Sequence, residues 1–328
     1  GYFSTVFRGI KLSNNAQIAI KVPHQEGSPR YAVNGLEVGE AQKQIEKERS
    51  VMQLLQMGGV RPYLSQLMDV VQDEESPYGD IKLILLKCGP NLGDWLEERG
   101  HRPPCGVKAE ITRQIYCGLK TLHDRGVSHR DLHLKNILVH KGEGCIKISD
   151  FGSSILKTEV PQRWEHLLRS ELYSATSHLI ATLWLGRCVA ARPKEARNQC
   201  AARGIEQADI ETVVHALYTR CTDMAWYPTH HIKYPWEKLF EGQAHLLQIL
   251  KDLFAWEFST NLDQTLGGIP VPSRFLPPLM VGRLLGPIAQ LTASNVFSMF
   301  DDQCADDLCH AAALYIRSGQ SNPILEEN

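Results

Sequence analysis

The chain has 328 residues, of which 43% are hydrophobic and 22% charged, and its formal net charge is −2. This composition suits a globular protein of one or two domains, and a charge so close to neutral gives no reason to expect nucleic acid or a membrane surface as a partner. Nine cysteines without a C-x-x-C pair indicate reduced thiols, and the apolar stretch at residues 275–291 is broken by prolines, so we expect a cytoplasmic or nuclear protein.

The first part of the chain predicts strands joined by tight turns. A glycine-led segment at residues 1–6 enters a strand, a turn follows at residues 13–15, and a second strand carries I-A-I-K at residues 18–21. The fifteen residues from Val6 to Lys21 match the length that a strand, a turn and a second strand require. The apolar run at residues 83–86 predicts a further strand, buried on both faces.

A helix is expected over roughly residues 36–55, where apolar side chains recur at helical spacing. Ile45, Met52 and Leu55 share one face of this helix with the carboxylate of Glu48. An unpaired charge on an apolar face is costly, so Glu48 should meet a cation from elsewhere in the chain.

A second helix and a hairpin are expected further along. The apolar stripe of this helix consists of Ile111, Ile115, Leu119 and Leu122. Gly126 is suited to a left-handed conformation at the end of the helix. Two short strands, at residues 137–139 and 145–148, are joined by the turn sequence K-G-E-G. The hairpin allows residues on its two sides to face one another.

Two motifs flank this hairpin in a fixed order. Residues 129–136 read H-R-D-L-H-L-K-N, and residues 150–152 read D-F-G. The first resembles the catalytic loop H-R-D-L-x-x-x-N, and the second the metal-binding motif, of the protein-kinase family. The resemblance covers about the first 152 residues and implies an α+β, bilobal fold. A small nucleotide-binding lobe of antiparallel strands and one helix would span residues 1–87, and a larger, mostly helical lobe with an atypical C-terminal half would span residues 88–328.

The resemblance implies transfer of the γ-phosphoryl group of ATP, with Mg²⁺, to a Ser, Thr or Tyr hydroxyl of a protein substrate. Asp131 would orient the acceptor hydroxyl, while Asn136 and Asp150 would hold the metal ion. Lys21 would bind the α- and β-phosphates, and Glu48 would be its partner. In the family, the first histidine of the loop packs against the phenylalanine of D-F-G as scaffolding.

The same resemblance predicts the rest of the nucleotide site. Residues 1–6 look like the second half of a glycine-rich loop whose preceding strand is missing, so we expect a fragment of a longer protein. Leu85 would border the adenine pocket, and the backbone of Leu86 and Cys88 would hydrogen-bond the base. Asp94 would reach the ribose. The predicted nucleotide-binding residues are Gly1, Val6, Ala19, Lys21, Glu48, Leu85, Leu86, Cys88, Asp94 and Leu138.

The match weakens after residue 152. The A-P-E sequence that closes the activation segment of the family is absent, and the nearest string, A-R-P-K-E, lies at residues 191–195. Residues 153–204 would hold a long activation segment or an extra helix at residues 177–185, and Asp209 would bond the backbone of the catalytic loop. Arg130 would bind a phosphate on the activation segment, preferably within residues 170–177.

The catalytic loop also departs from the family pattern. Serine/threonine kinases usually carry Lys two residues after the aspartate, where this chain has His133. Lys135, at the position where many tyrosine kinases have Arg, would supply a cation to the γ-phosphate, and is predicted to be catalytic with Asp131 and Asn136. The string D-L-H-x-x-N also resembles small-molecule kinases of the aminoglycoside and choline type, although these usually have Gly in place of Arg130. A protein kinase is the first hypothesis, a small-molecule kinase the second and a non-catalytic pseudokinase the third.

Overall fold

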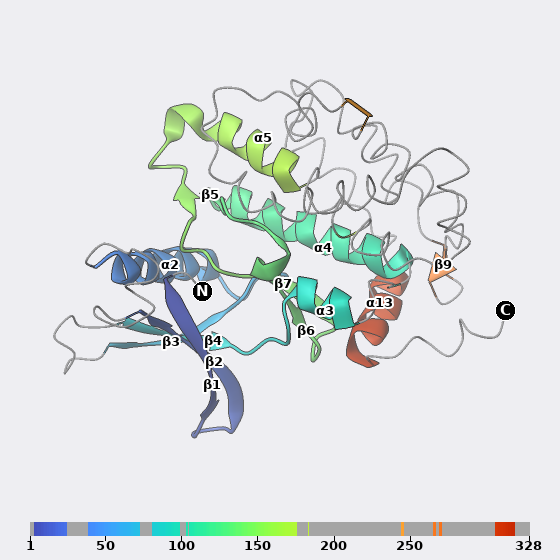
Figure 1. Ribbon diagram of the computed structural model, residues 1–328, viewed down its shortest axis with the longest axis horizontal. Helices are drawn as coiled ribbons and strands as arrows, with labels where there is room; N and C mark the ends of the chain where they lie inside the picture. The colour runs from blue at the N-terminus through green and yellow to red at the C-terminus, as the bar shows by residue number, and fades with distance from the viewer. Residues whose placement is uncertain are drawn as a thin grey trace.

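The computed structural model describes the chain in several stretches. These are residues 3–24, 39–72, 81–98, 103, 105–175, 183, 244–245, 265–266, 269–270 and 306–318. In chain order the elements are β1 (Ser4–Lys11), β2 (Ala16–Pro23), α2 (Glu40–Gln56), β3 (Leu67–Gln72), β4 (Ile81–Leu86), α3 (Leu92–Glu98), α4 (Cys105–Asp124), β5 (Val127–Ser128), the 3₁₀ helix η1 (Leu134–Asn136), β6 (Ile137–His140), β7 (Cys145–Ile148), β8 (Ile155–Leu156), the 3₁₀ helix η2 (Pro161–Arg163), α5 (Trp164–Ser174), β9 (Thr265–Leu266), β10 (Ile269–Pro270) and α13 (Asp306–Ser318). Figure 1 shows β1 to β4 with α2 in one part and the remaining helices in another, which we call the sheet layer and the helical layer.

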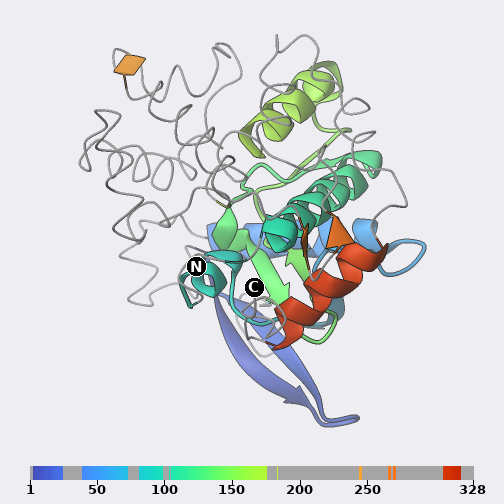
Figure 2. The same ribbon diagram turned by 90° about the vertical axis from the view of Figure 1, so that its right-hand side faces the viewer.

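Four antiparallel strands form the sheet layer, in the order β1-β2-β4-β3. The predicted turn joins β1 to β2, and the Asn14 side chain there accepts a hydrogen bond from the Ala16 N–H. In Figure 2 this hairpin projects away from the rest of the molecule. The predicted apolar strand forms β4, which lies between β2 and β3. Lys21 pairs with Leu83, so both side chains lie on the same face of the sheet.

Helix α2 covers that face of the sheet. It begins at Glu40 rather than near residue 36, and residues 25–38 lie outside the described part of the chain. Ile45 of α2 packs against Leu83 of β4. Glu48 lies on the same buried side of the helix and is only 2% exposed, as its position in the apolar stripe predicted.

Helix α4 forms the centre of the helical layer. The apolar stripe predicted for it is buried, and Gly126 follows the helix with a φ of 69°. Strands β6 and β7 pair as the predicted hairpin and lie against α4, where the Gln114 side chain accepts a hydrogen bond from the Ile146 N–H. A Cβ atom on Gly118 would lie 2.7 Å from Ile148 Cδ1, so a larger residue there would force the Ile148 side chain to shift.

Helix α13, distant in sequence, packs beside α4 and the hairpin (Figure 2). The Tyr315 ring meets the edge of the Trp95 ring of α3, with 6.3 Å between the ring centroids. In the hairpin turn, Gly144 has a φ of 70°, and a Cβ atom there would lie 2.7 Å from the carbonyl oxygen of Ala313. The segment 306–318 therefore packs against α3, α4 and the hairpin turn.

The loop between α2 and β3 joins the two layers. The Ile148 N–H of β7 donates to the Tyr63 carbonyl, and the Ser65 N–H donates to the Ile148 carbonyl, both at 2.8 Å. Tyr63 has a φ of 63°, which is uncommon for a residue other than glycine. Arg113 of α4 donates to the Tyr63 hydroxyl at 3.1 Å. These bonds hold the end of β7, just before residue 150, in a set position relative to α2.

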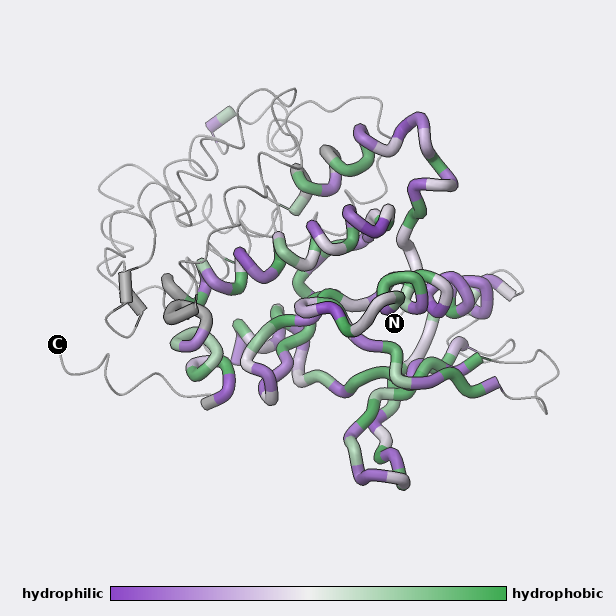
Figure 3. The backbone as a smooth tube through the Cα atoms, turned by 180° about the vertical axis from the view of Figure 1, so that it is seen from behind, coloured by the Kyte–Doolittle hydropathy of each residue, from purple (hydrophilic) through white to green (hydrophobic). Residues whose placement is uncertain are grey.

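Hydrophobic and hydrophilic residues alternate in short blocks along α2 and α4, as expected for helices that bury one side (Figure 3). Across the stretches that the structure describes, no helix has both the length and the apolar character needed to span a bilayer. The cytoplasmic or nuclear location stays a prediction.

The α+β arrangement is confirmed, while the lobe boundary at residue 87 stays a prediction. The segment after residue 152 differs from the expectation, because residues 164–174 form helix α5. The predicted phosphorylation window at residues 170–177 therefore begins within a helix. The string at residues 191–195 and Asp209 lie outside the described residues, as does the predicted helix at residues 177–185 apart from residue 183.

Candidate active site

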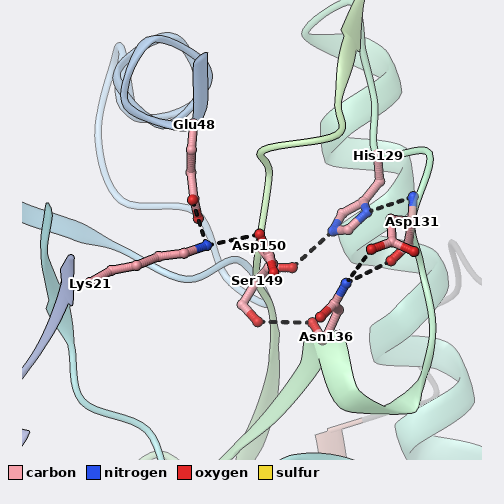
Figure 4. Close-up of polar contacts among 7 residues, drawn as sticks. All are labelled: Lys21, Glu48, His129, Asp131, Asn136, Ser149 and Asp150. Carbon is pink, nitrogen blue, oxygen red and sulfur yellow. Dashed lines mark hydrogen bonds and ion pairs between the residues drawn. The ribbon is translucent and has the colours of Figure 1, made fainter. Parts of the chain in front are cut away.

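The ammonium group of Lys21 lies between two carboxylates from distant parts of the chain. Its Nζ donates to Glu48 Oε2 at 2.6 Å and to Asp150 Oδ1 at 2.8 Å (Figure 4). Lys21 comes from β2, Glu48 from the buried side of α2, and Asp150 follows β7. The structure thus contains the predicted pair of Lys21 and Glu48, while the role of this pair in binding a nucleotide stays a prediction.

The charges in this cluster favour the ionised forms of Lys21 and Asp150, whereas complete burial raises the pKa of Glu48 above its ordinary value. Burial disfavours the Lys21 ammonium, but Glu48 and Asp150 outweigh it and raise the pKa of Lys21 above its ordinary value. Burial also opposes ionisation of Asp150, but the charge and the hydrogen bond of Lys21 outweigh it, so the pKa of Asp150 lies below its ordinary value. Asp150 is therefore a carboxylate at neutral pH.

His129 holds the loop that carries Asp131. The His129 Nε2 atom donates to the Ser149 carbonyl at 2.9 Å, while its Nδ1 atom accepts the Asp131 N–H at 3.3 Å. Its ring lies 5.4 Å from the buried Phe151 ring, measured between centroids. This is the scaffolding contact that the resemblance implied.

Asn136 connects Asp131 to the residue before Asp150. Its Nδ2 atom donates to the Asp131 carbonyl at 2.8 Å and to Asp131 Oδ2 at 3.2 Å. The N–H and hydroxyl groups of Ser149 both donate to the Asn136 carbonyl, at 2.8 and 3.0 Å (Figure 4). Because the amide nitrogen faces Asp131, the amide oxygen of Asn136 is turned away from it. A lysine, three acids and an amide thus meet at the junction of the two layers.

The sequence model of the protein kinase domain matches residues 1–182, which is more than half of the chain. The chain belongs to the protein kinase family. Mitogen-activated protein kinase kinase kinase ANP1 of Arabidopsis thaliana is 31% identical over 47% of this chain and 21% of that protein. Mitogen-activated protein kinase kinase kinase 5 of Homo sapiens is 33% identical over 47% of this chain and 10% of that protein. The probable serine/threonine-protein kinase MARK-B of Dictyostelium discoideum is 38% identical over 35% of this chain and 15% of that protein. The chain thus spans about a fifth or less of the length of these relatives.

An acid that sequence reasoning missed organises the catalytic loop of this kinase domain. Glu171 of α5 accepts the Arg130 N–H on Oε1 at 2.7 Å. Its Oε2 atom accepts the Ser128 hydroxyl at 3.0 Å and lies 2.7 Å from His123 Nε2. Arg130 has a φ of 71°, so this contact holds an uncommon backbone conformation directly before Asp131. Burial opposes ionisation of Glu171, but His123 and the Arg130 N–H outweigh it and lower the pKa of Glu171.

The contact made by Glu171 is the one expected of Asp209, which lies outside the described residues. Only twenty residues separate Asp150 from Glu171. Glu171 thus makes this contact from α5, which follows the D-F-G motif closely, while the role of Asp209 stays a prediction. A signal was present: Glu171 follows Leu167 and Leu168 at helical spacing and shares their buried side, as Glu48 does on α2.

The predicted adenine pocket begins with Leu85, which packs beside Leu83 on the face of the sheet that carries Lys21. The Leu86 N–H donates to the Gln66 carbonyl at 3.0 Å, and the Cys88 Sγ–H donates to the Leu86 carbonyl at 3.9 Å; the contact of either group with a base stays a prediction. Burial raises the pKa of the Cys88 thiol to about 11, which keeps it protonated at neutral pH.

The segment after β4 returns to the catalytic hairpin. The Gly89 N–H donates to the Val139 carbonyl at 2.8 Å, and Asn91 forms a β-bridge with Leu138. These contacts bring Leu138 next to the segment that contains Leu86 and Cys88. Asp94 accepts a hydrogen bond from Asn91 Nδ2 at 2.7 Å, so its carboxylate lies at the start of α3.

The remaining predicted site residues occupy varied positions. Ala19 pairs with Leu85, and Val6 pairs with Lys21 but is 56% exposed. Lys135 is exposed at the edge of the catalytic loop, and Gly1 lies outside the described residues. The parts of these residues in nucleotide binding and catalysis stay predictions.

Proposed function

We propose that this kinase domain transfers the γ-phosphoryl group of ATP to a Ser or Thr hydroxyl of a protein substrate. The observation that carries the proposal is the bonding of Lys21 to Glu48 and Asp150 at once. It places the predicted phosphate-binding cation beside the predicted metal-binding carboxylate. The names of the relatives support a protein acceptor, because one is a probable serine/threonine-protein kinase and two are kinases of protein kinases.

Members of the protein kinase family generally use ATP and Mg²⁺, and the residues present fit both. Asp150 offers an ionised carboxylate and Asn136 an amide oxygen turned away from Asp131. Such hard oxygen donors suit Mg²⁺, which is commonly bound by one or two side chains together with phosphate oxygens and water. The bound ion would neutralise charge on the phosphates. Lys21, held by two carboxylates, would orient the phosphates beside these ligands.

Asp131 would act on the acceptor hydroxyl. Its carboxylate is 27% exposed, so an acceptor can approach it from solvent. Asn136 holds one of its oxygens, which sets the direction of the carboxylate. In this position Asp131 can orient the hydroxyl group and accept its proton. Phosphoryl transfer depends mainly on positioning and charge stabilisation, which the contacts of Lys21 and Asn136 are suited to supply.

The proposal can be tested with Asp131→Asn and Asp150→Asn. Asp131→Asn should lower phosphoryl transfer by ~10²–10⁴-fold and leave nucleotide affinity nearly unchanged, because a positioned acid or base acts mainly on the reaction rate. Asp150→Asn should weaken Mg²⁺-dependent ATP binding itself. Transfer of labelled phosphate to casein and myelin basic protein measures the first effect, and calorimetric titration with Mg²⁺–ATP measures the second.

Asp124→Asn is the matched control, because Asp124 is an exposed aspartate at the end of α4, paired with Lys120 on the surface. This variant should match the wild-type protein in both assays. Choline and an aminoglycoside serve as further acceptors. Phosphorylation of these small molecules in place of proteins, or unchanged protein phosphorylation by Asp131→Asn, would contradict the proposal.

A further inference from the structure

His133 lies between Asp131 and the short helix η1. Its Nδ1 atom accepts the Lys135 N–H at 3.2 Å, and this bond caps the first turn of η1. Its Nε2 atom lies 3.6 Å from Asp131 Oδ1. The His133 side chain is only 14% exposed, so the ring is packed rather than free in solvent. One imidazole therefore contacts the loop backbone on one side and the predicted catalytic carboxylate on the other.

The backbone contact determines where the proton of the ring lies. An N–H group can donate only to an unprotonated ring nitrogen, so Nδ1 of His133 carries no proton. In a neutral imidazole the proton is then on Nε2, the atom that faces Asp131 Oδ1. A doubly protonated ring would lose the bond from Lys135. The arrangement therefore directs the Nε2–H group of His133 at Asp131.

The two oxygens of the Asp131 carboxylate thus meet different donors. Oδ2 accepts from Asn136 Nδ2 at 3.2 Å, while Oδ1 faces the Nε2–H of His133. The backbone N–H of Asp131 is held in addition by His129 (Figure 4). A separation of 3.6 Å exceeds hydrogen-bond length, but contacts in active sites commonly shorten when the substrate binds. A hydrogen bond from Asn136 alone still allows the Asp131 carboxylate to rotate about its Cβ–Cγ bond, and a second donor restricts this rotation.

We propose that His133 is a positioning residue that orients the Asp131 carboxylate through its Nε2–H group. This inference rests on the proposed phosphoryl transfer and adds His133 to the residues that act at this site. It differs from the role of a cation that binds phosphate, which would need a charged ring turned away from Asp131. Here the Nε2–H group faces Asp131, and the ring acts on the phosphate only through Asp131.

Two substitutions separate the two nitrogens of the ring. His133→Asn keeps an oxygen where Nδ1 lies and can still cap η1, but has no group that reaches Asp131. His133→Gln places an amide N–H near the position of Nε2 and loses the cap. We expect His133→Asn to lower kcat by about tenfold to a hundredfold, with KM for ATP changed less than about twofold. His133→Gln should recover a large part of kcat despite its poorer cap.

His140→Asn is the matched control, because His140 also accepts a backbone N–H on Nδ1, from Glu143 at 3.0 Å, but lies in the hairpin turn. Its kcat should equal that of the wild-type protein. A rise in KM for ATP with unchanged kcat in His133→Asn, or a kcat for His133→Lys at or above that of the wild-type protein, would overturn the proposal in favour of a phosphate-binding cation.

A spectroscopic measurement tests the same geometry without catalysis. In ¹⁵N NMR spectra of the histidine rings, the signals lost in His133→Asn should show an unprotonated Nδ1 and a protonated Nε2 at neutral pH. The opposite tautomer, or a doubly protonated ring, would overturn the proposal. If the wild-type protein phosphorylates no acceptor, the proposed function fails, and the tautomer alone then decides whether His133 is directed at Asp131.

Discussion

Replacing Glu171 with alanine should destabilise the domain and disable the catalytic loop together. Three donors meet this carboxylate: the Arg130 N–H, the Ser128 hydroxyl and the His123 ring. The Glu171 and His123 side chains are 4% and 3% exposed, so water can replace few of the hydrogen bonds that the substitution removes. Leaving buried donors without their acceptor typically costs about 1–3 kcal/mol for each donor, so the loss of all three bonds should cost at least about 3–5 kcal/mol. For a domain of this size, that loss corresponds to a fall in Tm on the order of 10 °C.

Glu171→Gln should be milder, at about 1–3 kcal/mol, because the amide keeps an oxygen that can accept the Arg130 N–H. Glu165→Ala is the control, since Glu165 lies exposed on the first turn of the same helix. Its effect should stay within about 0.5 kcal/mol. Calorimetry measures the stability of all three variants, and a peptide phosphorylation assay measures kcat, which depends on the geometry of the catalytic loop. A Tm of Glu171→Ala equal to that of the wild-type protein would contradict this role of Glu171. A lower Tm with the full wild-type kcat, measured at a temperature where the variant is folded, would contradict it as well.

Three other outcomes follow from the same structure. Because the folded pKa of Glu171 lies below its unfolded value, its stabilising contribution is complete above about pH 4.3 and is lost as the pH falls through the lower folded pKa. Denaturant titrations across acidic pH should show this loss in the wild-type protein and less of it in Glu171→Gln. Gly144→Ala should cost about 1–3 kcal/mol, because its Cβ would overlap the Ala313 backbone, whereas Gly142→Ala in the same turn meets only a histidine side chain and should melt near the wild-type Tm. Lys21→Met should lower Tm, because it leaves two carboxylates without their shared cation, and titration should show weaker ATP binding; unchanged values of both would contradict the role of Lys21.

Much of the candidate site could be predicted because its signals are local. The spacing from Asp131 to Asn136 and the hairpin before Asp150 are properties of a short segment, and the turn sequence and strand pattern specify how it folds back. Glu48 was identified by helical periodicity, since a carboxylate in an apolar stripe must find a cation. In each case a few consecutive residues contain enough information to determine the local geometry.

Other features depended on the tertiary structure. Periodicity shows that Glu171 is buried, but not that its partner is the Arg130 N–H, 41 residues earlier. The docking of α13 on the hairpin turn depends on a glycine and an alanine 169 residues apart, Gly144 and Ala313. The ring of His133 likewise has a direction only once η1 and Asp131 are in place. By itself, the sequence determined which side chains must be buried or paired and where the chain must turn. The packing of distant segments decided which partner each side chain meets. Many partners could satisfy a buried polar side chain, whereas the close packing of the folded protein admits only one.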